Sequence, residues 1–238
     1  MKDILSAVLD LVYPRLCGAC GRTVGEDERH VCWDCLARLE ILVPPFCSHC
    51  GDPVEGAVDG PFVCAWCRSS APHFELARSA ARYRGPLKAL IHGFKYLQAT
   101  HVEADLAMLL AACVETHYPK VPFDAVTFVP LHPARERERS YNQAQLLARQ
   151  LARHLRLPLM PRGLRRIRAT VTQTHLKAHE RRANMHDAFV AVDPAWTEGR
   201  RLLLVDDVMT TGATVDECAR VLKAAGAVSV HVVTVGRG

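Results

Sequence analysis

Eight cysteines arranged as four Cys-x-x-Cys pairs constrain this chain more than any other feature of its sequence. Shifting the chain by about thirty residues superimposes the first two pairs on the last two, and a glycine directly follows the first pair of each unit. The segment is therefore an internal repeat of one small unit. The pairs are Cys17/Cys20, Cys32/Cys35, Cys47/Cys50 and Cys64/Cys67.

Such pairs are typical of zinc sites. Two residues between cysteines bring both sulfur atoms to one side of a tight turn, and two pairs complete a tetrahedral site of four thiolates. A closed site of this kind leaves no position for a substrate, so the metal is expected to fold the segment rather than catalyse. The sequence predicts two structural zinc sites, Cys17/Cys20/Cys32/Cys35 and Cys47/Cys50/Cys64/Cys67.

Several alternatives to this assignment remain. Disulfides, a redox dithiol and an iron–sulfur cluster also use paired cysteines, but four repeated pairs outside a strand-to-helix context favour zinc. The repeat favours sequential pairing of the four pairs, although spacing alone also permits interleaved pairing. His30 and His49 are possible substitute ligands.

The apolar runs of the chain are too short to cross a membrane. The longest, such as 202–205 and 232–235, fall far below the roughly 20 residues that a spanning helix needs. Near the start of the sequence, Asp3 and Asp10 stand where a secretory signal requires an uninterrupted apolar stretch. We expect a cytoplasmic protein without membrane insertion, and a reducing compartment disfavours disulfides.

The net charge of +5 is unevenly distributed. Residues 1–71 contain six Lys and Arg against ten Asp and Glu, whereas residues 135–182 contain thirteen against three. Each four-thiolate zinc site would add a further net −2 to the first segment. A ribbon that holds phosphates should be basic, so the cysteine-rich segment is expected to have a docking or structural role.

The clearest chemistry lies at residues 202–214. Four apolar residues predict a buried strand, apolar residues at helical spacing follow from Val215, and a second buried strand covers 228–235. This β-loop-α-β unit should be parallel and right-handed, with ligands at the carboxyl ends of its strands. There Asp206 and Asp207 could accept hydrogen bonds from a sugar diol, and the following loop offers N–H groups and hydroxyls to an anion.

A strand that merely ends in acidic residues is the simpler alternative, and no G-x-G-x-x-G or Walker A sequence suggests a dinucleotide or ATP. The stretch resembles the phosphoribosyl-pyrophosphate (PRPP) motif of type I phosphoribosyltransferases. In that family two acids hold the ribose 2′- and 3′-hydroxyls and the loop holds the 5′-phosphate. The resemblance implies that Asp206 and Asp207 are ribose ligands, and that the phosphate cradle comprises Met209, Thr210, Thr211, Gly212, Ala213 and Thr214.

Two basic segments occupy the middle of the chain. Residues 123–129 predict another strand, and an arginine-rich loop over 135–139 precedes a helix that begins near Asn142. A pyrophosphate there would meet side-chain charge and the helix dipole, although alternating Arg and Glu could equally form a self-paired surface. Residues 164–189 contain few apolar residues and are expected to form a mobile basic lid. Its candidate ligands are Arg168, Thr170, Gln173, Lys177, Arg181 and Asn184.

A closer resemblance covers nearly the whole chain. The paired cysteine ribbons, Phe94-Lys95-Tyr96, the basic loop ending in Tyr141-Asn142-Gln143, the Thr170 and Arg181 motifs and the PRPP motif together resemble the ComF/GntX family. Its members join a double zinc ribbon to a phosphoribosyltransferase-like domain, and some are needed for DNA uptake in naturally transformable bacteria. One departure is Ser140, where the family pattern has glycine. The pyrophosphate candidates implied are Lys95, Arg137, Arg139, Ser140, Tyr141 and Asn142.

We therefore predict an N-terminal helix and double zinc ribbon over residues 1–70, and an α/β type I phosphoribosyltransferase-like domain with a central parallel sheet over 71–238. A short connecting region is expected near 68–80. The leading hypothesis is binding of PRPP, or another phosphorylated ribose, with Mg²⁺ and transfer of its ribosyl phosphate to an unidentified acceptor. The alternative is a non-catalytic competence component in which residues 135–182 hold single-stranded DNA or a competence-machinery protein, although this segment lacks stacking aromatic residues. Cys113 and Cys218 are expected in the core.

Overall fold

The computed structural model describes residues 14–56, 58–168 and 186–238. The zinc-ribbon segment contributes two short helices and the rest of the chain alternates strands and helices. The elements are α2 (Trp33–Ala37), α3 (Ala65–Ser70), β1 (Leu76–Arg82), α4 (Gly85–Tyr96), η1 (Thr100–Val102), α5 (Glu103–His117), β2 (Ala125–Phe128), α6 (Pro133–Arg139), α7 (Gln143–Leu155), β3 (Leu164–Arg166), β4 (Phe189–Ala191), α9 (Pro194–Thr197), β5 (Arg201–Met209), α10 (Ala213–Ala224) and β6 (Ser229–Arg237).

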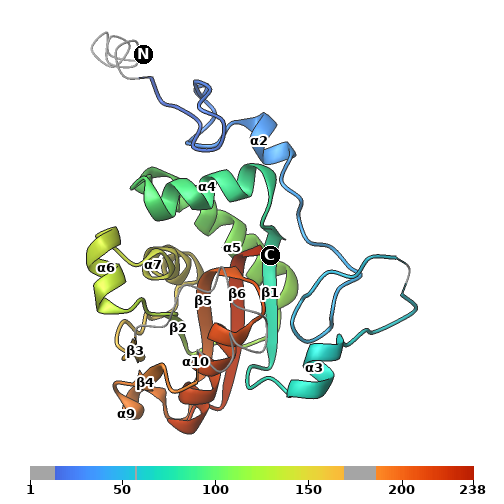
Figure 1. Ribbon diagram of the computed structural model, residues 1–238, viewed down its shortest axis with the longest axis vertical. Coiled ribbons are helices and arrows are strands. Elements are labelled where there is room, and N and C mark those ends of the chain that lie inside the picture. The colour runs from blue at the N-terminus through green and yellow to red at the C-terminus, as the bar shows by residue number, and fades with distance from the viewer. Residues whose placement is uncertain (1–13, 57, 169–185) are drawn as a thin grey trace.

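A four-stranded sheet in the order β1-β6-β5-β2 forms the centre of the molecule (Figure 1). All three strand pairs are parallel. The predicted β-loop-α-β unit is β5-α10-β6, and the strand predicted over 123–129 is the shorter β2. The parallel central sheet predicted from the sequence is therefore confirmed.

Helices cover both faces of the sheet. Because side chains alternate along a strand, Leu203 and Val205 of β5 pack against the α4, α5 and α7 side, while Leu202 and Leu204 pack against α10. Burial on both faces explains the continuous apolar run in β5. The expected core cysteines, Cys113 and Cys218, are buried on α5 and α10 respectively.

The outer edge of β1 is covered by the segment that joins the two cysteine units. The Leu42 N–H donates to Ala80 O at 3.0 Å, and the Arg82 N–H donates to Glu40 O at 2.8 Å. Figure 1 shows this segment descending from α2 beside β1. The prediction of a connecting region near 68–80 is wrong for its second half, because residues 76–82 are a strand of the central sheet.

Two further expectations need correction. The arginine-rich stretch predicted as a loop is helix α6, which begins with Pro133 after His132, whose Nδ1 accepts a hydrogen bond from the Ala134 N–H at 3.3 Å. The ends of the predicted mobile segment pair as the antiparallel strands β3 and β4, with Leu164 and Phe189 buried. Among the described residues, no helix is long and apolar enough to cross a membrane.

Candidate functional site: two cysteine clusters and a carboxylate-phosphate loop

The eight cysteines of the repeat converge into two clusters. One cluster unites the first four cysteines and the other the last four, with the sulfur atoms of each set within 4.8 Å of one another. The sequential pairing favoured by the repeat is therefore confirmed, and neither His30 nor His49 joins a cluster of the described residues.

The geometry of both clusters fits a tetrahedral zinc ion. Four sulfurs at the usual zinc–sulfur distance are separated by about 3.8 Å in a tetrahedron. The Sγ atoms of Cys20 and Cys32 lie 3.8 Å apart, and those of Cys50 and Cys64 lie 3.7 Å apart. All ten cysteines are free thiols. These cysteine-rich sites suit structural zinc.

The same local turn builds both clusters. The Cys17 N–H donates to Arg22 O at 2.7 Å, and at the equivalent place in the second unit the Cys47 N–H donates to Asp52 O at 2.8 Å. Gly21 and Gly51 take φ values of 74° and 69°, in the left-handed region where a glycine has no Cβ to strain. The glycine after each first pair is thus explained by the turn that carries the sulfurs.

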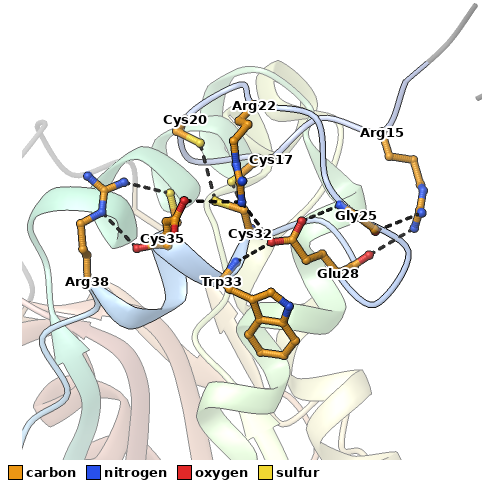
Figure 2. Close-up of polar contacts among 11 residues, drawn as sticks. Arg15, Cys17, Cys20, Arg22, Gly25, Glu28, Cys32, Trp33, Cys35 and Arg38 are labelled. Atoms are coloured by element: carbon orange, nitrogen blue, oxygen red, sulfur yellow. Dashed lines mark hydrogen bonds and ion pairs between the residues drawn. The ribbon is translucent and has the colours of Figure 1, made fainter. Parts of the chain in front are cut away.

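In the first unit, a buried carboxylate holds the loop between the two cysteine pairs (Figure 2). Glu28 accepts hydrogen bonds from the backbone N–H groups of Gly25 and Trp33 at 2.5 and 2.7 Å, and it pairs with Arg22 at 3.1 Å. The hydrogen bonds from Gly25 and Trp33 lower the pKa of Glu28 below its usual value. The ionised Glu28 carboxylate therefore stabilises the loop of the first unit. Its role was not predicted from the sequence.

The two acids of the PRPP-like motif lie within β5 near its carboxyl end, and they face different neighbours. Asp207 is buried and accepts a hydrogen bond from Lys95 Nζ of α4 at 2.8 Å. Asp206 accepts one from the Asp207 N–H at 2.8 Å. The structure thus brings together three residues that the sequence analysis named, Lys95 included, although 112 positions separate it from Asp207.

Burial and neighbouring charges shift the pKa values of Asp206 and Lys95. Burial raises the pKa of Asp206 to about 7, and the charge of Asp207 acts in the same direction against the opposing charges of Lys95 and Arg166. Burial lowers the pKa of Lys95, but Asp207 and Asp206 more than compensate, so its pKa lies above the usual value. Strongly perturbed carboxylates in a cleft are typical of functional sites.

The loop after β5 surrounds a cavity of about 40 Å³. Gly212 has a φ of 80° and is the N-cap of α10 without a side-chain cap of its own, while the Ala213 N–H donates to Thr211 Oγ1 at 3.5 Å. Backbone N–H groups at the start of a helix favour an anion. The cavity is lined by Asp206, Val208, Val215 and all six residues predicted to cradle a phosphate, Met209 to Thr214.

The basic helix α6 contacts helix α4 through its last arginine, Arg139. The Arg139 guanidinium stacks 4.9 Å from the centre of the Tyr96 ring and donates to Gln143 Oε1 at 3.2 Å. The Tyr141 hydroxyl donates to Phe94 O at 2.5 Å, which ties this region to α4. Arg139 therefore contacts Tyr96 and Gln143 instead of pairing with the glutamates of its own helix.

Ser140 occupies the left-handed conformation that the family's glycine would adopt. Its φ is 68°, and it ends α6 two residues before Asn142, whose side chain caps α7 by accepting from the Gln145 N–H at 3.3 Å. Ser140 therefore retains the backbone turn of the family's glycine, but its Cβ makes this left-handed backbone conformation strained.

We expect Ser140→Gly to stabilise the fold by up to about 1 kcal/mol, because it removes the Cβ penalty of a left-handed residue. Urea unfolding of both proteins measures the difference. Ser69→Gly is the matched control, because Ser69 lies within helix α3, where glycine should instead destabilise by roughly half a kcal/mol. Equal or lower stability of Ser140→Gly would contradict the strain at this position.

Of the six lid candidates, only Arg168 belongs to the described residues. Thr170, Gln173, Lys177, Arg181 and Asn184 lie outside the described residues. Arg168 is described and donates to His186 O at 2.6 Å, which joins the two ends of the segment.

Arg166 and Arg237 are basic residues at this site that the sequence analysis missed. Burial lowers the pKa of Arg166, whose charge interacts with Asp206. Arg237 is buried at the end of β6 and donates to Met209 O at 3.0 Å and to Thr210 O. Only the pairing of β6 with β5 brings Arg237 near the loop, so no local sequence pattern could have identified it.

A parallel sheet with an acid pair and a phosphate-type loop, joined to two four-cysteine clusters, defines a protein of the phosphoribosyltransferase fold with a double zinc ribbon. The family described as double zinc ribbon domain matches residues 8–68, and that described as phosphoribosyl transferase domain matches residues 142–237. The chain belongs to the ComF/GntX family, whose members combine these two parts.

Similar proteins carry names that refer to competence or to DNA utilization. The chain is 34% identical over 207 residues to Competence protein F of Haemophilus influenzae, covering 85% of this chain and 88% of that protein. It is 33% identical over 226 residues to the DNA utilization protein YhgH of Salmonella typhimurium, covering 93% and 96%. A solved glutamine PRPP amidotransferase from B. subtilis is similar at 26% identity and a TM-score of 0.38, over 56% of this chain and 25% of that chain.

Proposed function

We propose that this protein binds PRPP as its Mg²⁺ complex at the carboxyl end of β5 and transfers the ribosyl phosphate to an acceptor, in a process of DNA uptake or utilization. The observation that carries the proposal is the shared cavity. Asp206 and the whole loop from Met209 to Thr214 line one small space beside the N-terminal end of α10. The names of the similar proteins support the link to DNA.

Each part of the site would have a defined task. Asp206 and Asp207 would accept hydrogen bonds from the ribose hydroxyls, and the loop N–H groups would bind the 5′-phosphate. Mg²⁺ would neutralise charge on the pyrophosphate. In the transfer, a bond from C1 of the ribose to the acceptor would form as the bond from C1 to pyrophosphate breaks. The electron pair of the broken bond would stay on the pyrophosphate, whose charge Lys95 and Arg139 would stabilise.

The test is titration calorimetry of the zinc-loaded protein with PRPP in the presence of Mg²⁺, followed by a search for pyrophosphate release with candidate acceptors. We expect saturable binding of PRPP to one site per chain. Free ribose, which has neither the pyrophosphate nor the 5′-phosphate, should not bind. Absence of heat with PRPP across a range of temperatures would refute the proposal.

Binding should depend on pH through Asp206. Its pKa of about 7 lies above the usual value for an aspartate, so the carboxylate that accepts hydrogen bonds is depleted as the pH falls below 7. Because one proton must leave Asp206 before PRPP binds, PRPP affinity should fall by up to about tenfold for each unit by which the pH drops below 7. Carboxyl ¹³C NMR of the free protein should show one aspartate titrating near pH 7 that is absent from Asp206→Asn. If Asp206 titrates near 4, this assignment is wrong.

A second candidate function rests on the exposed basic residues of α7, β3 and the segment between them, which would hold single-stranded DNA by contacts to its phosphates. Such binding should weaken steeply with salt and survive loss of the ribose-binding acids. Fluorescence anisotropy with a labelled single strand, for wild type and Asp206→Asn/Asp207→Asn, tests both points. Salt-independent binding or no binding would exclude it. The exposed arginines are Arg149, Arg153, Arg156, Arg162 and Arg165.

A further inference from the structure

The second zinc ribbon lies directly against the phosphate loop. Trp66 stands between Cys64 and Cys67, both ligands of the second cluster. A Cβ built on Gly212 would meet the Trp66 indole at 3.2 and 3.6 Å and the Met209 side chain at 2.8 Å. The indole ring therefore packs on the one residue of the loop whose backbone has a positive φ.

A salt bridge makes a second connection between the same two parts. Asp52 belongs to the turn of the second cluster, since its carbonyl accepts from the Cys47 N–H. Its carboxylate pairs with Arg237 at 2.8 Å, and the buried Arg237 side chain also donates to the carbonyls of Met209 and Thr210. Arg237 thus fixes the backbone at the start of the phosphate loop while its other end is held by the ribbon.

The first ribbon has no such contact among the described residues. Cys17, Cys32 and Cys35 share a hydrophobic cluster with α4, α5 and α7, whereas the cysteines of the second ribbon share theirs with Met209, Ala213 and Val215 of the loop and α10. Trp33 lies between the cysteines of the equivalent pair, but its side chain is 60% exposed. The first ribbon therefore serves as an internal control for the second, because it belongs to the same repeat but does not contact the phosphate loop among the described residues.

We propose that Trp66 and the Asp52–Arg237 pair are positioning residues for the phosphate loop, so that zinc in the second ribbon and the 5′-phosphate in the loop favour each other's binding. The inference rests on the proposed function for the identity of the anion. A loop already held in its binding conformation loses less entropy when the phosphate binds, which raises affinity. Because such coupling is reciprocal, bound phosphate must retain the zinc equally well.

The first experiment compares PRPP affinity, by calorimetry with Mg²⁺, in zinc-loaded variants. Trp66→Ala and Asp52→Asn should each bind PRPP about tenfold more weakly, within the usual range of coupling between sites. Trp33→Ala is the matched control and should bind like wild type. Zinc content and circular dichroism are measured on every variant, so that a loss of binding is compared only between folded proteins with two zinc ions.

The second experiment measures zinc binding instead of PRPP binding. The zinc released to a coloured chelator at equilibrium is measured in wild type and in Trp66→Ala, with and without saturating PRPP and Mg²⁺. PRPP should raise the affinity for one zinc ion of the two about tenfold in wild type, and the Trp66→Ala variant should lose most of this protection. Protection of both ions equally would indicate general stabilisation and overturn the specific link.

The outcomes separate this inference from the proposed function. If PRPP does not bind wild type, both fail. If PRPP binds wild type, Trp66→Ala and Asp52→Asn with equal affinity and leaves zinc release unchanged, the proposed function stands and the inference is overturned. Weaker binding to Trp33→Ala than to Trp66→Ala would likewise contradict it.

Discussion

Replacing both Asp206 and Asp207 with asparagine is expected to lower PRPP affinity by about a hundredfold or more, since each lost charge-assisted hydrogen bond contributes roughly 1.5–3 kcal/mol. Asparagine retains the shape of aspartate but presents an NH₂ group where a carboxylate oxygen accepted. It also leaves Lys95 without its partner Asp207, which places an uncompensated cation beside the ribose. Calorimetry with PRPP and Mg²⁺ measures the loss.

Melting temperatures and a control variant distinguish a functional from a structural role of these acids. The folded-state pKa of Asp206 lies above its unfolded value, so ionisation of this carboxyl opposes folding as the pH rises towards 7. Asp206→Asn alone should therefore be at least as stable as wild type at pH 8, as judged by its melting temperature. Asp124→Asn is the control for loss of a carboxylate, because Asp124 pairs with Arg201 at the opposite end of β5. That variant should bind PRPP normally, and weak binding by it would contradict the assignment.

The second large effect is expected from the cysteine clusters. Wild type should contain two zinc ions per chain, and Cys47→Ser/Cys50→Ser should contain one. Structural zinc binds with an apparent free energy of about 10–16 kcal/mol, so loss of one ion should unfold the unit that it holds. Zinc content is measured by atomic absorption, and limited proteolysis should cleave within residues 47–67 of the variant only.

Cys113 supplies the control for this substitution. It is buried on α5 and belongs to neither cluster, so Cys113→Ser should retain two zinc ions even though its stability falls. A wild-type content well below two, or a cluster variant that still binds two, would refute the assignment.

Much of the site could be predicted from the sequence because its chemistry is encoded by local spacing. Cys-x-x-Cys places two sulfurs on one turn whatever surrounds it, and the repeat then indicates which pairs combine. The run 202–205 followed by Asp206 and Asp207 likewise defines a buried strand whose carboxyl end presents acids. In both places, the neighbouring residues in the sequence are also the neighbours in space.

The contacts that were missed depend on distant segments. Strand β1 reads Leu-Ala-Arg-Ser-Ala-Ala-Arg, which lacks the β-branched residues typical of strands, and it forms only because β6 and residues 40–42 pair with it. The buried Arg78 in this strand donates to Ser48 O at 2.9 Å, a contact that no charge pattern predicts. Helix α6 was mistaken for a loop although Pro133 gave a helix-start signal.

Coverage of the β1 edge by residues 40–42 has a consequence for the metal-free protein. A strand at the edge of a sheet exposes unpaired N–H and C=O groups that recruit strands from other molecules. The segment that covers β1 is anchored at both ends by a cysteine unit, so metal loss would release it and expose the Ala80 C=O and Arg82 N–H groups that it now pairs. We therefore expect zinc to protect this protein from aggregation by strand addition, so that removal of zinc by a chelator increases light scattering.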